Sequence, residues 1–308
     1  MNAPTPFGPR TDADEIVEGL DLTGRTIVVT GANTGIGYET ARALASAGAR
    51  VVLACRDATT GGAAAERIRR THPGARAEAA QLDLASFASI RAFAEGLDAE
   101  RIDAVVCNAG LAVTDYGETE DGFERTVGIC HVGHFLLVRW LMPRLLAAER
   151  PRVVMVSSES HRMPARLDFD RLPMNASNFR GLVAYGQAKL CNVLFAKALQ
   201  RRYGERGLVA CALHPGTLVT TEIGRHSGLM RLLVQLVSPF TKTPSQGAAT
   251  TVWAVVHEPA AELRGRYLSH CRPARESEEA RDPAVADRLW SCSETWVEPA
   301  GAPEWPAP

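Results

Sequence analysis

Lysine is scarce in this chain of 308 residues, where only Lys189, Lys197 and Lys242 occur among 34 basic residues. Arginine supplies the remainder. The formal net charge is −1 and no stripe of basic residues stands out, which argues against nucleic acid as a partner. Arginine would provide a surface charge equally well but never gives up its proton. A lysine in a chain that otherwise uses arginine is therefore a candidate for a role in proton transfer.

Long hydrophobic runs, secretion signals and cysteine pairs are missing as well. No apolar run reaches the roughly 18–20 residues that cross a bilayer, and residues 1–10 lack the apolar segment of a signal peptide. The seven cysteines show no Cys-x-x-Cys spacing, which indicates reduced, buried thiols. We therefore expect a cytoplasmic protein without a transmembrane segment.

Spacings typical of a metal site are also absent. The eight histidines are scattered, apart from His131 and His134. This pair lacks a plausible third ligand, so we expect no metal.

Short runs rich in β-branched residues alternate with longer segments of helical periodicity. We expect strands at residues 25–30, 50–54, 76–81, 103–107, 151–156, 208–213 and 265–268. We expect helices at residues 35–47, 59–71, 87–97, 122–148 and 184–203, with a kink at Pro143. This alternation predicts an α/β fold, a doubly wound parallel sheet of about seven strands in a single Rossmann-fold domain. The third strand is the most polar and is expected near an edge.

The ends of the chain and two irregular stretches complete the organisation. Residues 1–22 are expected as a loose N-terminal tail with a short surface helix at 12–20, residues 23–297 as the domain, and residues 298–308 as a Pro-rich tail.

Residues 159–183 and 217–243 interrupt the alternation after strands, at the edge where open α/β sheets bind ligands. We interpret them as a substrate wall and a substrate lid, with plain surface loops as the alternative.

A glycine-rich turn joins the first strand to the first helix of the domain. Glycines let the backbone approach a ligand, and the helix N-terminus offers free N–H groups to a pyrophosphate. The spacing is Gly-x3-Gly-x-Gly rather than the commoner Gly-x-Gly-x-x-Gly. The turn predicts a dinucleotide site formed by Gly31, Asn33, Thr34, Gly35, Ile36 and Gly37.

The end of the second strand distinguishes two cofactors. A carboxylate there would bind the ribose 2′-hydroxyl of NAD, whereas a guanidinium suits a 2′-phosphate. The chain has Cys55 and then Arg56, and Asp57 lies where it would cap the next helix. We predict NADP(H), with Arg56 as a plain surface residue the alternative.

The ends of the next two strands contribute further candidates. Asp83 and Leu84 follow the third strand, within reach of an adenine, although Asp83 could also serve as a helix N-cap. Asn108, Ala109 and Gly110 follow the fourth strand, where small residues allow close approach to a cofactor or simply a tight turn.

Tyr185 and Lys189 lie one helical turn apart, so their side chains project from the same face of a helix. A phenol titrates near ~10 in water, and a nearby cation favours its charged form. The pair is therefore a way to build a general acid or base, although by itself such a pair is also common on solvated helix faces.

Taken together, these motifs resemble the short-chain dehydrogenase/reductase family. The glycine turn, residues 108–110, the serine after the fifth strand, Tyr185-x3-Lys189 and Pro215-Gly216 follow the family's order across about residues 24–297. Residues 54–57 (ACRD), 133–137 (GHFLL), 156–158 (VSS) and 214–216 (HPG) are most similar to its retinol dehydrogenase-like branch. That branch also contains bacterial ketoreductases that act on bulky polyketides.

The resemblance implies roles for individual residues. Ser158 would hold the substrate oxygen, with Ser157 the competing choice, and Tyr185 would exchange the proton. Lys189 would bind the nicotinamide ribose and assist the tyrosine. The loop that contacts the nicotinamide would contain Pro215, Gly216 and Thr220.

One position departs from the family's pattern. Family members usually carry an asparagine where this chain has Cys130, and that asparagine is thought to hold a water that passes protons to the lysine. A thiol is only a weak hydrogen-bond partner. We expect an active enzyme, with a low-turnover nucleotide-binding regulatory or scaffold protein as the alternative.

The resemblance also implies the partners. The expected substrate is a small hydrophobic carbonyl or alcohol, such as a polyketide-, anthracycline-, retinoid- or steroid-like molecule, and the sequence does not set the direction of the reaction. Family members often form homodimers or homotetramers through the long helix at 122–148 and the helix at 184–203. Apolar faces on these helices also fit burial within one subunit.

Overall fold

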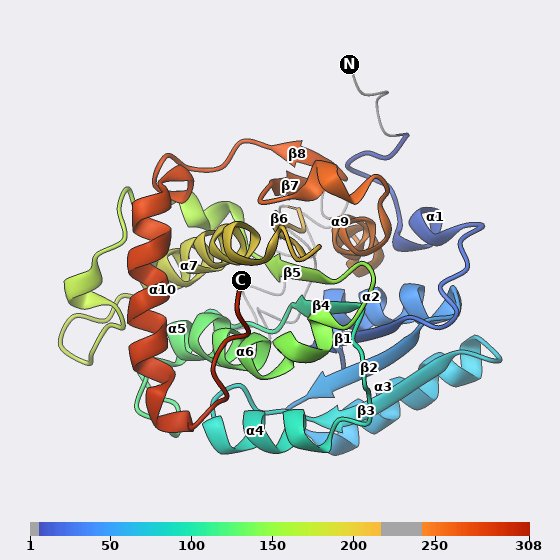
Figure 1. Cartoon of the computed structure of the whole chain (residues 1–308), viewed down its shortest axis with the longest axis horizontal. Helices are drawn as coiled ribbons and strands as arrows, with labels where there is room; N and C mark the ends of the chain where they lie inside the picture. Colours follow the sequence, from blue (N-terminus) through green and yellow to red (C-terminus); the bar gives the residue numbers. More distant parts are fainter. Residues whose placement is uncertain (1–5, 217–241) are drawn as a thin grey trace, which may run out of the picture.

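The computed structural model describes residues 6–216 and 242–308, and within them one eight-stranded sheet organises the chain (Figure 1). The strand order is β3-β2-β1-β4-β5-β6-β7-β8; the first seven pair in parallel and β8 pairs antiparallel with β7. The strands are β1 Thr26–Thr30, β2 Arg50–Cys55, β3 Arg76–Gln81, β4 Ala104–Cys107, β5 Arg152–Val156, β6 Val209–His214, β7 Tyr267–Ser269 and β8 Arg272–Ala274. The predicted doubly wound sheet is thereby confirmed, with β3 at an edge. The eighth strand was not predicted, because it is short, contains Pro273 and lacks an apolar pattern.

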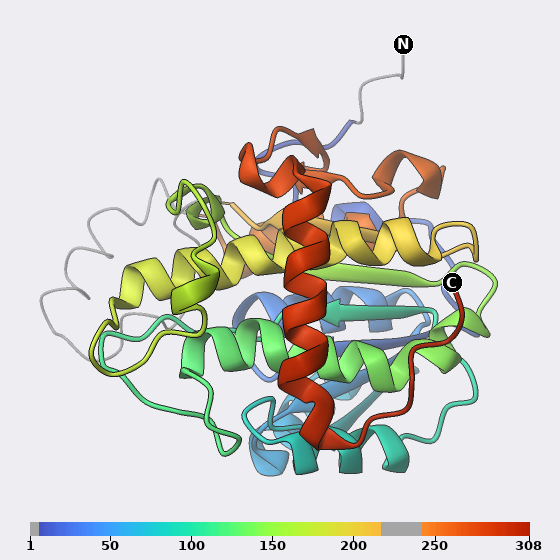
Figure 2. The same ribbon diagram turned by 60° about the vertical axis from the view of Figure 1, so that its left-hand side comes forward.

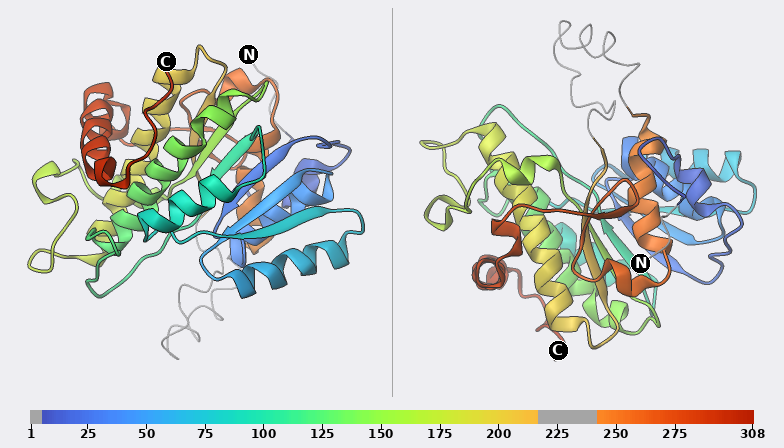
Figure 3. Two further views of the ribbon diagram at one scale, coloured as in Figure 1. Left: turned by 60° about the horizontal axis from the view of Figure 1, so that its bottom comes forward. Right: turned by 90° about the horizontal axis from the view of Figure 1, so that it is seen from above.

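Helices cover both faces of the sheet, which makes three layers (Figures 1 and 3). One apolar core joins the sheet to α1, α2, α3 and α9, and the other joins it to α4, α6, α7 and α10. The helices are α1 Ala13–Val17, α2 Gly35–Ser46, α3 Ala58–Thr71, α4 Phe87–Gly96, α5 Arg125–Val127, α6 Gly133–Leu146, α7 Gly181–Tyr203, α9 Pro244–Val256 and α10 Pro283–Val297. In the part of the chain that the structure describes, no helix has both the length and the apolar character needed to cross a bilayer.

The long helix expected at residues 122–148 is divided in the structure. A π-helical segment, η1 Gly128–Val132, separates α5 from α6 and contains Cys130 and His131. Pro143 lies inside α6, which continues past it to Leu146. Periodicity did not reveal the division, because the π-helical residues are as apolar and as buried as a regular helix would be.

In the part of the chain that the structure describes, residues 6–22, expected in a loose N-terminal tail, and residues 298–308, expected as a Pro-rich tail, both pack against the domain. Ala13, Ile16 and Val17 of α1 are buried against α2 and α9, and Leu22 is buried as well. At the other end, the Trp305 ring lies 4.6 Å from that of Trp290 on α10. A few apolar side chains pack both segments against the domain, although proline and glycine also occur in these segments.

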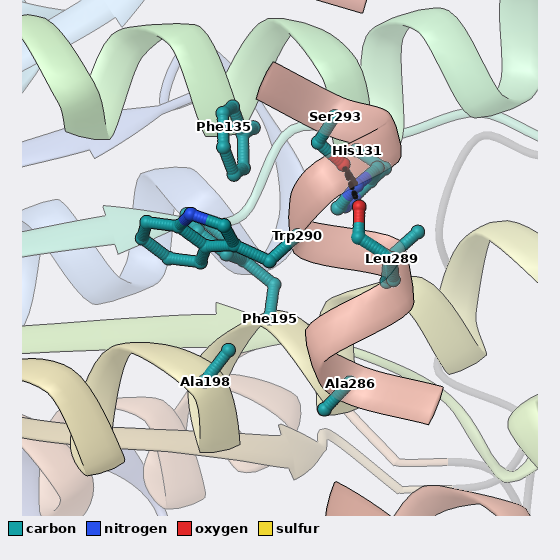
Figure 4. A pocket seen from close by; sticks show the side chains of 8 residues that line it. All are labelled: His131, Phe135, Phe195, Ala198, Ala286, Leu289, Trp290 and Ser293. Atoms are coloured by element: carbon teal, nitrogen blue, oxygen red, sulfur yellow. Dashed lines mark hydrogen bonds between the residues drawn. The ribbon is translucent and has the colours of Figure 1, made fainter. Parts of the chain in front are cut away.

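Helix α10 crosses the outside of α6 and α7 (Figure 2), the two helices through which the resemblance suggested subunit contacts. The contact is apolar around Phe135, Phe195 and Trp290, with one buried polar link (Figure 4). His131 Nε2 lies 2.8 Å from Ser293 Oγ, and that hydroxyl donates to Leu289 O at 2.8 Å. His131 is thus a core histidine that ties η1 to α10.

Candidate active site

The glycine turn is packed so closely that two of its glycines cannot carry a side chain. A Cβ on Gly37 would lie 2.3 Å from Gly31 O and 2.5 Å from Asn108 Nδ2. Gly31 has φ +63°, and a Cβ there would lie 3.1 Å from Ala109 Cα. The first turn of α2 therefore rests directly on the backbone at the end of β1, and the end of β4 closes the same space.

Thr30 holds this packing together from the last position of β1. Its hydroxyl accepts the N–H groups of Asn108 and Ala109, each at 2.9 Å, and lies 2.9 Å from His134 Nε2. His134 Nδ1 donates to Cys130 O at 3.0 Å, so Nε2 is left to accept the Thr30 hydroxyl proton. Burial lowers the pKa of His134 to about 4, which keeps this ring neutral. Thr30 was not among the predicted site residues, although its place just before the glycines could have suggested it.

The N-terminus of α2 fits the pyrophosphate of a dinucleotide. Its N-cap residue Thr34 is exposed and makes no capping hydrogen bond, and no acidic residue lies in the first turn. In contrast, side chains cap α3, α4, α9 and α10. Free N–H groups and the helix dipole favour an anion at such an end. Asn33, Gly35 and Ile36 lie in the same turn, so the predicted residues 31–37 come together.

Arg56 is exposed at the end of β2, beside this turn. Asp57 is the N-cap of α3 and accepts Thr60 N–H at 2.7 Å, as the sequence suggested. Thr60 Oγ1 also accepts Asn33 Nδ2 at 3.4 Å, which connects the turn to α3. With Asp57 occupied by the helix, Arg56 is the charged side chain at the end of β2 that remains for a ligand.

The end of β3 contains Asp83 and Leu84. Ser86, not Asp83, is the N-cap of α4, so the alternative of a cap at Asp83 is wrong. Asp83 instead accepts Ala85 N–H at 2.9 Å within the loop. Leu84 is buried, and its carbonyl would lie 2.4 Å from a Cβ on Gly133. This loop therefore packs against the start of α6.

The two serines after β5 have different surroundings. Ser157 is buried, and its hydroxyl donates to Lys189 O at 2.7 Å. Ser158 is half-buried, and its hydroxyl accepts Ser160 N–H at 3.2 Å as the N-cap of the 3-10 turn η2 Glu159–Arg162. Ser157 is thus committed to α7, whereas Ser158 remains accessible from the site.

Helix α7 brings Tyr185 and Lys189 next to these serines. Lys189 is buried, its Nζ donates to Val156 O at 3.0 Å, and it lies 5.5 Å from the centre of the Tyr185 ring. Asn192 Nδ2 donates to the same carbonyl at 3.2 Å. Together with the Ser157 hydroxyl, these bonds fasten the middle of α7 to the carboxyl end of β5. The predicted pair and Ser158 therefore come together at one edge of the sheet.

Cys130 lies on the other side of Lys189. A Cβ on Gly110 would lie 3.1 Å from Cys130 Sγ and 3.2 Å from Lys189 Nζ. Cys130 is fully buried, and its thiol donates only a weak bond to Leu111 O at 3.8 Å. Gly110 is consequently the residue that leaves space between the thiol and the ammonium.

The loop after β6 is described only in part. Gly216 has φ +118°, and a Cβ there would meet the side chain of Lys242 at 2.5 Å. Lys242 Nζ lies 3.3 Å from His270 Nδ1, and burial lowers the pKa of Lys242. Thr220 and residues 217–241 of the expected lid lie outside the described residues. Lys242 was not predicted, because it lacks a partner in its own stretch of sequence.

Comparisons with known proteins agree with this geometry. A family model described as short chain dehydrogenase matches residues 25–169. The WW domain-containing oxidoreductase of Danio rerio is 44% identical over 308 residues, covering 97% of this chain and 75% of the relative. Retinol dehydrogenase 12 of Homo sapiens is 44% identical over 276 residues, covering 89% of this chain and 86% of the relative. A crystal structure from Beutenbergia cavernae with bound NADP matches with a TM-score of 0.64 and 26% identity, covering 80% of this chain and 95% of that one. Because the two relatives align along nearly the whole chain, it belongs to the short-chain dehydrogenase/reductase family of oxidoreductases, on the retinol dehydrogenase-like branch.

Proposed function

We propose that the protein is an NADP(H)-dependent oxidoreductase that reduces a ketone or aldehyde on a bulky hydrophobic molecule. The observation that carries this proposal is the arrangement of Tyr185, Lys189 and Ser158 at the carboxyl end of β5. Two hydroxyl groups there can act on a single substrate oxygen, and an ammonium lies beside the tyrosine.

Each residue has a distinct part in the reaction. Ser158 and Tyr185 donate hydrogen bonds to the substrate oxygen, and these bonds strengthen as negative charge develops on it. Tyr185 then gives up its proton, and the ammonium of Lys189 stabilises the phenolate that remains. The nicotinamide, when bound, supplies the hydride. In the direction of oxidation the same residues take the proton back.

Arg56 and the glycine turn support NADP(H) as the cofactor. The uncapped N-terminus of α2 would receive the pyrophosphate, and Arg56 would pair with a 2′-phosphate through its forked donors. Asp57 does not compete for the 2′-position, because it caps α3.

Exposed apolar side chains support a hydrophobic substrate. Four large apolar residues are exposed in the described part of the chain, and three of them, Met163, Leu182 and Val183, lie beside Tyr185. Leu182 and Val183 lie in the turn of α7 before Tyr185, and Met163 Cβ lies 3.4 Å from a Cβ placed on Gly186. Leu182 is 70% exposed and Met163 is 54% exposed. Such a cluster at the mouth of a site suits an apolar ligand.

The test is a turnover assay with NADPH and a panel of retinoid-like aldehydes, steroid ketones and polycyclic ketones, followed at the nicotinamide absorbance band. We expect reduction of one or more compounds, and a loss of about 10²- to 10⁴-fold in kcat in Tyr185→Phe, the usual contribution of a general acid. Turnover that survives this substitution would contradict the assigned proton donor.

Cys130 provides the specific reason to keep the second candidate, a low-turnover nucleotide-binding protein. Its thiol occupies the position beside Lys189 and makes only a weak bond. If NADPH binds and no compound of the panel is reduced, the assay is repeated with Cys130→Asn. Turnover gained by that variant would favour the second candidate for the parent chain.

A further inference from the structure

His161 lies directly behind Ser158 and has no part in the chemistry described above. It is fully buried in η2, with Nδ1 2.6 Å from Ser158 O and Nε2 3.2 Å from the backbone nitrogen of Ser277. One imidazole thus bridges the serine turn and the segment between β8 and α10, which is 116 residues away in sequence.

The two partners fix the tautomer of this ring. A backbone N–H can only donate, so Nε2 carries no proton and accepts from Ser277; a carbonyl can only accept, so Nδ1 carries the proton and donates to Ser158. A charged ring would place an N–H against the N–H of Ser277. Burial lowers the pKa of His161, in keeping with a neutral ring. The Tyr267 ring packs against it with centroids 4.6 Å apart.

Beside Ser277, the segment at the other end of this bridge also contacts α7, the helix that carries Tyr185. Glu276, next to Ser277, pairs with Lys197 of α7 at 2.6 Å. At the near end, Gly186 lets η2 rest on α7, since a Cβ there would lie 2.9 Å from Ser160 O. The Ser158 turn is therefore held between two points of α7, one beside Tyr185 and one further along the helix.

We propose that His161 is a positioning residue that sets the Ser158 hydroxyl relative to Tyr185, through a neutral imidazole with its proton on Nδ1. The inference rests on the proposed carbonyl reduction, in which both hydroxyls must reach one oxygen. A displacement of about 1 Å can reduce such a rate by roughly 10²-fold.

Two substitutions at His161 each keep one of its two hydrogen bonds and remove the other. In His161→Asn the amide nitrogen can replace Nδ1 as the donor to Ser158 O, whereas in His161→Gln the amide oxygen can replace Nε2 as the acceptor from Ser277. We expect the Gln variant to lose roughly tenfold or more in kcat, the Asn variant to stay within about threefold of the parent, and the Kd of NADPH to remain unchanged in both. His72→Gln, the same change far from the site, serves as the control.

Spectroscopy tests the tautomer without turnover. In ¹⁵N-labelled protein at neutral pH, the His161 ring, assigned from its absence in the variants, should show a protonated Nδ1 and an unprotonated Nε2. A ring protonated on Nε2, equal activity of the Gln variant and the parent, or weaker NADPH binding in both variants would overturn the proposal. Absence of turnover in the parent itself would instead remove the proposed function and this inference with it.

Discussion

The two parts of the proposed site, the glycine turn (the cofactor half) and the surroundings of Ser158 (the substrate half), differ in the groups that form their contacts. Around the glycine turn the backbone itself is closely packed: Gly37 rests on Gly31 O with no space for a methyl group, and the short side chain of Thr30 links β1 to the end of β4. Around Ser158 the contacts run through long side chains, with His161 bonded to Ser277 and Tyr267 donating to Glu159. Close backbone packing requires glycines at a fixed spacing in the sequence, whereas side chains that meet in the folded structure can come from any part of the chain.

The largest loss of NADPH affinity should follow from Gly37→Ala, which places a methyl group against the backbone of the glycine turn. The new Cβ would overlap Gly31 O, and overpacking of this kind costs about 1–3 kcal/mol or more. We expect NADPH affinity to fall by more than about 100-fold and the melting temperature to drop, measured by calorimetry.

Gly62→Ala is the matched control, because Gly62 lies within α3 and a Cβ there would meet no described atom within 4 Å. It should keep NADPH affinity and gain up to about 1 kcal/mol from the loss of backbone freedom in the unfolded chain. Similar losses in both variants would contradict the close packing of the glycine turn.

Arg56→Ala should have the next largest effect, because it removes a charged contact without disturbing the backbone. A hydrogen bond to a charged group contributes about 1.5–3 kcal/mol, so NADPH affinity should fall roughly tenfold to hundredfold. NADH lacks the 2′-phosphate and should bind as before. The Kd values of NADPH and NADH, titrated side by side, test this assignment. An equal loss of affinity for both would show that Arg56 does not bind the 2′-phosphate.

Gly186→Ala tests a close backbone contact in the substrate half. The added Cβ would lie 2.9 Å from Ser160 O and 3.0 Å from Pro164 Cδ, so η2 must shift by a few tenths of an ångström. We expect kcat to fall by about tenfold while NADPH affinity stays within twofold, because the glycine turn is untouched. Steady-state kinetics and a cofactor titration measure the two effects. A loss of cofactor affinity would show that the halves are not independent.

The last effect is on the stability of the fold rather than on the site, and it concerns the packing that supports α7 and η1 from outside. Burial, together with the neighbouring His134, lowers the pKa of His131 from its ordinary 6.5 to about 3. The unfolded chain therefore binds one more proton than the folded chain between these values, and stability falls as the pH falls below about 6.5. One such proton changes the free energy of unfolding by about 1.4 kcal/mol per pH unit.

His131→Gln removes this titration while leaving a donor for Ser293. Denaturant unfolding of the parent and the variant, followed from pH 6.5 down to pH 4.5, should therefore give curves that converge at acid pH by about 1.4 kcal/mol per unit. Parallel curves would contradict a neutral buried ring at His131.

Sequence patterns predicted the place of the glycine turn between β1 and α2, while the binding of a cofactor by its residues stays a prediction. Residues 31–37, Arg56 and Asn108 follow β1, β2 and β4, and parallel strands deliver their carboxyl ends to one edge of the sheet. Patterns placed a short helix at residues 12–20, where α1 lies, but missed its burial, and they missed η1 and the packing of Trp305. Each depends on packing against a distant surface, which overrides local composition.

The sequence by itself determined the sheet, the place of the glycine turn and the pairing of Tyr185 with Lys189 on one helix, because hydrophobic period and backbone sterics act over a few residues. Only the tertiary structure decided that Ser157 bonds to Lys189 O, that Ser158 is the accessible serine, and that His161 bridges it to Ser277. The Ser157–Lys189 and His161–Ser277 contacts join residues 32 and 116 positions apart. A hydrogen bond needs two groups within about 3 Å, and only the folded chain brings such distant groups together.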